Sequence, residues 1–211
     1  TGFNAPTFND LYWLDPFFVG NANLDPEESE NIDLGVKWKM DNSYLALNVY
    51  QYDIDNMIAY DGSVFPGTMV NINEAEINGF EASYSVTFGD NTISTAYTYT
   101  DTEDKATGNR LQRRPLHNLS VDYDQQFSEK LSYGLTLLAQ SDSYNNSSNS
   151  EKMTAFGKAD ARISYQLNET VSLEAKVENL LDKDYSTTRS FSQGNYLTGG
   201  RLAYISASLS F

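Results

Sequence analysis

Strict alternation of apolar and polar residues near the end of the chain is the feature that most constrains the fold. From Val171 to Glu178 every second residue is apolar, and the pattern returns from Ala203 to the final residue, Phe211. Side chains of a β-strand point alternately to opposite faces, so both segments are predicted to be strands with one apolar and one polar face. A last strand that ends on phenylalanine indicates the wall of an outer-membrane β-barrel.

Similar alternating segments recur along the chain and predict about ten antiparallel strands. Tight turns are expected at residues 41–43, 89–91 and 168–170, and five long loops are expected, three of them at residues 7–28, 61–76 and 101–113. The long loops begin near Thr7, Asp61, Asp101, Asp142 and Ser186. Outer-membrane barrels have tight periplasmic turns and long extracellular loops. A soluble β-sandwich adhesion module, the alternative, has no reason to place every long loop on one side.

Composition agrees with a single many-stranded domain over residues 1–211. The chain has 13 glycines, 15 tyrosines, 11 phenylalanines and no cysteine, which excludes a disulfide scaffold and a Cys-ligated metal site. No run approaches the roughly 20 apolar residues of a membrane helix, so a membrane protein of this sequence must be a barrel. A formal net charge of -15 disfavours nucleic acid as a partner.

The polar faces of the predicted strands carry charges of both signs, which a barrel would direct into its lumen. We expect them to pack against a plug or trapped water rather than to form a substrate path. These residues are Asp33, Lys37, Lys39, Glu81, Asp122, Asp124, Lys158, Asp160, Arg162, Glu174, Lys176 and Glu178.

Four segments resemble motifs of TonB-dependent outer-membrane receptors. They are residues 179–185 (Asn-Leu-Leu-Asp-Lys-Asp-Tyr), the terminal strand to Phe211, Gly79-Phe80-Glu81, and the pair formed by residues 5–7 and 23–27. Barrels of this family have 22 strands and a plugged lumen. The resemblance implies that ten strands form the carboxyl-terminal part of such a barrel. The plug, the TonB-contacting segment and any signal peptide are expected to lie outside this sequence, which opens on Thr1 without a methionine.

Within that family, residues 5–13 and 181–185 look most like cobalamin (vitamin B-twelve) receptors. Carried over by position, Arg113 and Tyr196 fall where cobalamin receptors contact their ligand. The sequence departs from those receptors at Pro115-Leu116-His117, which is closer to the family at large. The resemblance places the calcium-binding loops of cobalamin receptors in the missing half, and no resident cofactor is expected in this chain.

The candidate ligand-binding residues are aromatic or cationic side chains in the expected loops. Tyr12 and Trp13 could stack on a ligand, or belong to the aromatic girdle of the barrel. Tyr144 and Tyr196 have the same two interpretations, as does Phe191. Arg113 could bind a phosphate or amide of the ligand. Its alternative is an ordinary salt bridge to one of the nearby acids, Asp101, Glu103 and Asp104.

No residue set supports catalysis or a metal site. His117 is the only histidine and is expected at the barrel rim, and no nucleophile, phosphate-loop or His-rich motif is present. This argues against an outer-membrane lipase or protease barrel. Residues 101–104 have the alternating oxygens that calcium prefers but lack the glycine and spacing of an EF-hand, so a solvated loop is expected.

The resemblance therefore predicts a non-enzymatic receptor in the outer membrane of a Gram-negative bacterium. Its extracellular loops would bind a scarce, large ligand, and the missing amino-terminal part would receive energy from TonB. A corrinoid is the expected ligand, with an iron-siderophore (or haem) as the alternative.

Overall fold

The computed structural model describes residues 1–190 and 194–210 and is almost entirely β structure. Ten strands follow one another in a continuous antiparallel path, β1-β3-β4-β5-β6-β7-β8-β11-β12-β15, and β2 (Phe18–Val19) adds to β5 in parallel. Their bounds are β1 Gly2–Asn4, β3 Glu27–Lys39, β4 Ser43–Asp61, β5 Gly67–Phe88, β6 Asn91–Asp104, β7 His117–Gln126, β8 Leu131–Gln140, β11 Phe156–Gln166, β12 Val171–Glu178 and β15 Leu202–Leu209. The predicted all-β class and strand number are confirmed, while Phe211 lies outside the described residues.

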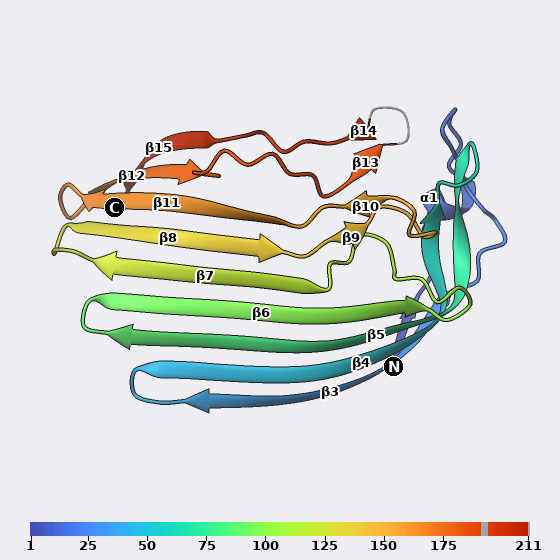
Figure 1. Cartoon of the computed structure of the whole chain (residues 1–211), viewed down its shortest axis with the longest axis horizontal. Coiled ribbons are helices and arrows are strands. Elements are labelled where there is room, and N and C mark those ends of the chain that lie inside the picture. The colour runs from blue at the N-terminus through green and yellow to red at the C-terminus, as the bar shows by residue number, and fades with distance from the viewer. Residues whose placement is uncertain (191–193, 211) are drawn as a thin grey trace.

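Tight turns and long connections lie at opposite ends of this sheet. Figure 1 shows the hairpins β3-β4, β5-β6, β7-β8 and β11-β12 turning at one end, and the longer connections at the other. The tight turns include Met40 N–H donating to Ser43 O and Leu167 N–H donating to Val171 O. The sidedness predicted from loop lengths is therefore observed, and we call the second end the loop end.

One face of the sheet is apolar although none of the described residues covers it. Ile32, Trp38 and Ile205 are 75%, 63% and 88% exposed. The strand register brings β3 side chains such as Val36 beside Leu47 of β4, and so continues one apolar face from strand to strand. An apolar surface of this extent requires a partner, and in a transmembrane barrel that partner is lipid. No helix among the described residues is long and apolar enough to span a membrane.

On the polar face of the sheet, opposite the apolar face, Gly79 lets the side chain of Tyr50 pass over strand β5. The register aligns Tyr50 of β4, Gly79 and Thr100 of β6. The Tyr50 ring covers Gly79, where a Cβ atom would overlap it, and the Tyr50 hydroxyl lies 3.0 Å from Oγ1 of Thr100. Glycine at this position thus joins three strands through one tyrosine.

Two of the predicted loops are shorter than expected. Residues 67–76 belong to β5 and residues 101–104 belong to β6, so the loop expected at 61–76 reduces to the residues between β4 and β5. A strand needs about 9–11 residues to cross a membrane, and β5 has 22. Beyond the apolar band both faces meet water, and acidic residues stand opposite each other, as Asp53 does Glu76. The apolar alternation that identifies membrane strands is therefore absent there.

The loop expected at residues 7–28 also contains regular structure. A short helix, α1 (Phe8–Tyr12), follows Thr7, whose hydroxyl and backbone N–H exchange hydrogen bonds with Asp10 in a capping box. The cap offsets the unpaired N–H groups of the first turn. Glu27 and Glu28 already belong to β3.

Candidate functional site

Three connections interlock at the loop end and form the scaffold of the candidate site. Asn149 accepts from the N–H of Arg110 at 2.8 Å and donates to its carbonyl at 2.8 Å, joining residues 105–116 to the connection between β9 (Ser143–Tyr144) and β10 (Lys152–Met153). Asn145 is buried, accepts from the N–H of Arg189 and donates to its carbonyl. This joins the same connection to β13 (Arg189–Ser190).

Arg113 and Tyr144, both predicted as ligand contacts, are brought together here. The N–H of Arg113 donates to the carbonyl of Tyr144 at 2.6 Å, and Arg113 has a left-handed backbone with φ 59°. Such a conformation is uncommon outside glycine and is retained where the surroundings impose it. Over the Tyr144 ring lies the guanidinium of Arg110, 5.8 Å from the centroid, a cation–π geometry.

A cavity of about 250 Å³ opens beside these residues. Its polar lining residues include Arg110, Arg113 and Arg114 with Gln112, and its apolar lining residues come chiefly from the end of β4. The apolar lining residues are Met57, Ile58, Ala59, Ile72 and Leu111. Arg110, which the sequence did not single out, lines this cavity beside the predicted Arg113.

The salt-bridge alternative for Arg113 is not observed. Among the described residues, no carboxylate lies within ion-pair distance of Arg113. Glu103 instead pairs with Lys105 at 3.0 Å, and Asp104 is buried and accepts the N–H of Ala106. Lys105 also pairs with Glu76 at 2.6 Å, and these hydrogen bonds, that to Glu76 first, raise the pKa of its ammonium.

Tyr196 lies in a different part of the loop end and does not line the arginine cavity. It follows β14 (Gly194–Asn195), is 52% exposed, and donates its N–H to the carbonyl of Thr188 at 3.1 Å. Because Asn145 holds the neighbouring Arg189, this hairpin is fixed to the connection that carries Tyr144. Phe191 lies outside the described residues.

Tyr12 and Trp13 stand at the end of α1 with large exposed surfaces, 58% and 51% of the residue. Together with neighbouring exposed apolar residues they form a group that we call the apolar loop cluster. Its members are Phe8, Tyr12, Trp13, Leu14, Phe17 and Phe65. Within it the rings of Phe8 and Tyr12 lie 5.3 Å apart, and those of Phe17 and Phe65 6.2 Å apart. The structure therefore places these aromatics where a large ligand could reach them, and neither Tyr12 nor Trp13 lines the arginine cavity.

Asp15 fixes the orientation of Trp13. Its carboxylate accepts the indole Nε1–H at 2.9 Å and the N–H groups of Phe17 and Phe18 at 2.7 and 2.8 Å. These hydrogen bonds, that from Trp13 first, lower the pKa of the Asp15 carboxyl.

Acidification is expected to release Trp13. Because the folded pKa of Asp15 is depressed, its stabilisation of the loop is fully present above the unfolded pKa and is lost as the pH falls through the folded one. The fluorescence difference between the whole protein and its Trp13→Phe variant should therefore change only in acid. The transition should be absent when Asp15 is replaced by asparagine; a neutral-pH transition would contradict this account.

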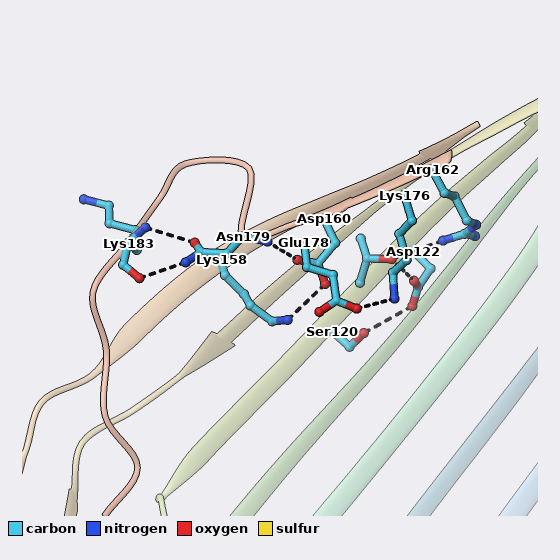
Figure 2. Close-up of polar contacts among 10 residues, drawn as sticks. Ser120, Asp122, Lys158, Asp160, Arg162, Lys176, Glu178, Asn179 and Lys183 are labelled. Carbon is cyan, nitrogen blue, oxygen red and sulfur yellow. Dashed lines mark hydrogen bonds and ion pairs between the residues drawn. The ribbon is translucent and has the colours of Figure 1, made fainter. Parts of the chain in front are cut away.

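Asn179 explains the structural role of the segment 179–185, on which the resemblance mainly rests. It ends β12 with a left-handed backbone, φ 52°, and is buried. Its side chain accepts the N–H of Lys183 at 3.0 Å and donates to the carbonyl of Lys183 at 2.9 Å. Its own N–H donates to Asp160 at 2.8 Å, and Asp160 pairs with Lys158 at 3.0 Å (Figure 2). The segment is thus a turn anchored in the polar face of the sheet.

Further ion pairs on the polar face complete this network. Figure 2 shows Lys176 beside Glu178, and their charged groups lie 2.6 Å apart. Arg162 forms an ion pair with Asp124 by crossing Gly134 of the intervening strand β8. These three ion pairs therefore neutralise part of the charge on this face.

His117 begins β7 and contacts aromatic residues. Its Nδ1 lies 2.8 Å from the hydroxyl of Tyr97, and its ring lies 5.4 Å from that of Tyr99. Among the described residues, no group of three or more His, Cys, Asp or Glu side chains could hold a metal ion.

Comparisons with known proteins agree with this architecture. A relative from Photobacterium profundum, described as "Vitamin B12 transporter BtuB", is 34% identical over 88% of this chain and 31% of the relative. A relative of the same description from Vibrio vulnificus is 32% identical, over 94% of this chain and 32% of the relative. The chain spans about a third of the length of these curated relatives.

Solved structures share the fold. "Copper transporter OprC" superposes with a TM-score of 0.85 at 17% identity, covering 99% of this chain and 36% of that one. The siderophore receptor PirA from Acinetobacter baumannii superposes with a TM-score of 0.73 at 22% identity, and the match covers 92% of this chain and 33% of PirA. At these identities the likeness establishes the fold alone.

Membership of a family follows from the sequence itself. A family model described as "TonB dependent receptor-like, beta-barrel" matches residues 1–180 of the chain. The soluble sandwich and the hydrolase barrel are therefore set aside, and the sheet with its exposed apolar face is part of a transmembrane barrel wall. The chain belongs to the TonB-dependent receptor-like β-barrel family of outer-membrane receptors.

Proposed function

We propose that the whole protein containing this chain binds cobalamin at its extracellular loops and imports it with energy supplied through TonB. The observation that carries the proposal is the 34% identity, over 88% of the chain, to a protein described as a vitamin B12 transporter. We assign the contact with TonB to the amino-terminal part of the whole protein.

The loop end offers the chemistry that such a ligand needs. A corrinoid is large and partly apolar, and carries amide and phosphate groups. The exposed rings of Tyr12 and Trp13 provide apolar contact area, and Arg113, Tyr144 and Tyr196 provide cationic and hydroxyl donors. These five residues are the proposed ligand contacts.

An iron-siderophore receptor is the second candidate. It is supported by the arginines of the cavity, which could bind an anionic iron chelate. The identity to PirA is 22%, which is lower than the identity to the BtuB relatives. A corrinoid is therefore the favoured ligand and an iron-siderophore the second candidate.

Titration of the whole protein in detergent with cyanocobalamin tests the proposal. We expect binding at micromolar ligand or below, and none with a ferric siderophore. Trp13→Ala should weaken binding, whereas Trp38→Phe, on the apolar face, serves as the matched control and should leave it unchanged. Binding of the iron chelate without cyanocobalamin would reverse the order of the two candidates.

A further inference from the structure

Three arginines line one cavity in a chain that is otherwise strongly acidic. The formal net charge is -15, yet the described cavity wall carries Arg110, Arg113 and Arg114 against one carboxylate, that of Asp104. Guanidinium groups gathered in this way repel one another and are retained where an anion compensates them.

None of the three arginines has a carboxylate partner among the described residues. The ion pairs of the described part of the chain involve Lys105, Lys152, Lys158, Arg162 and Lys176. Asp104, although it lines the cavity, accepts the N–H of Ala106 through Oδ1 and forms no ion pair. The Nε of Arg110 is buried without a hydrogen-bond partner in the described structure. A buried donor of a charged group left unpaired is costly, so the Arg110 guanidinium is not fully compensated within the described structure.

The backbone around the cavity is already fixed in position. Asn149 holds Arg110 through two hydrogen bonds, Tyr144 holds the N–H of Arg113, and Thr102 accepts the N–H of Leu111 at 3.1 Å. One Nη of Arg110 is also anchored, donating to the carbonyl of Arg114 at 3.0 Å. Binding would therefore order little beyond the side chains of Arg113 and Arg114.

The size and shape of the cavity define which part of a ligand fits. About 250 Å³ lies below the usual range of whole-ligand pockets, roughly 300–1,000 Å³. Apolar residues such as Met57 and Ile72 line it together with the arginines. It suits a small portion of a large ligand that has an apolar body and an anionic substituent.

We propose that Arg110, Arg113 and Arg114 form a subsite for a phosphate ester. The planar, multi-donor guanidinium matches phosphate oxygens better than an ammonium does. This inference rests on the proposed function, because cobalamin carries one phosphodiester, in its nucleotide loop. It assigns that group to this cavity and the corrin ring to the apolar loop cluster.

Comparing cyanocobalamin with cobinamide, which lacks the nucleotide loop and its phosphate, tests the inference in the whole protein. Arg110→Gln and Arg113→Gln should each weaken cyanocobalamin binding about tenfold or more, and should leave cobinamide binding nearly unchanged. Arg201→Gln, which changes an exposed arginine outside the cavity, is the matched control. Equal losses for both ligands, or no loss for either, would overturn the assignment.

Calorimetric titration with inorganic phosphate separates this inference from the proposed function. We expect weak binding by the whole protein that Arg110→Gln abolishes and Arg201→Gln preserves. If phosphate binds in this way but cyanocobalamin does not, the anion subsite stands and the corrinoid assignment falls. If no phosphate binding depends on Arg110, the subsite itself is refuted.

Discussion

Replacing Gly79 by leucine is expected to lower the free energy of unfolding of the barrel by about 1–3 kcal/mol. The new side chain would occupy the space of the Tyr50 ring, which covers Gly79 in the register Tyr50–Gly79–Thr100. The ring would leave the strand surface and lose its 3.0 Å contact with Thr100, a hydrogen bond worth about 1 kcal/mol. Urea unfolding of the whole protein in detergent, followed by heat-modifiable gel mobility, measures the loss.

A double-mutant cycle isolates the cause. In a Tyr50→Ala background, Gly79→Leu should no longer destabilise the protein, because the ring that it displaces is gone. Gly157→Ala is the control, since a Cβ there meets its nearest neighbour, the Leu138 carbonyl, at an ordinary 3.5 Å. If Gly79→Leu destabilises the protein equally with and without the Tyr50 ring, then the passage of that ring over β5 is not the reason for glycine at this position.

The sequence predicted the strands wherever lipid covers one face. Alternation located β12 (Val171–Glu178) at its observed bounds, because burial against lipid requires every second residue to be apolar. This requirement for alternating apolar residues does not apply beyond the membrane. There β5 continues with Glu74 and Glu76 in place of apolar residues. That is why residues 67–76 were wrongly predicted to be a loop.

The helix α1 was missed for a different reason. Five residues are too few to display a helical period. Its signal was nevertheless present, since Thr7 and Asp10 have the spacing of a capping box. Local hydrogen bonding, rather than apolar patterning, specifies this element.

The candidate site was predictable only in part. Arg113 and Tyr144 were singled out, but nothing in the sequence indicates that the Arg113 N–H meets the Tyr144 carbonyl. Arg110 was missed because its placement depends on the Tyr144 ring, 34 residues away in the chain, and on Asn149. The asparagine-rich stretch at residues 145–149 was the available signal, since asparagine favours left-handed turns and bonds to backbone groups.

Replacing Asn179 by alanine is expected to lower the free energy of unfolding by about 2–3 kcal/mol, because three contributions are lost together. Alanine is disfavoured at φ 52° by about 1 kcal/mol. The two hydrogen bonds with Lys183 contribute about 1 kcal/mol each, and both partner groups belong to a turn whose anchor is buried. Urea unfolding of the whole protein measures the change.

The glycine variant separates backbone conformation from side-chain bonding. Asn179→Gly keeps the left-handed backbone without strain and loses only the bonds to Lys183, so it should cost less than Asn179→Ala by about 1 kcal/mol. Both variants retain the N–H that donates to Asp160. Equal losses in the two variants would exclude a contribution from the left-handed conformation. Stability unchanged in both would mean that the turn is held by Asp160 alone, and that this asparagine does not anchor the end of β12.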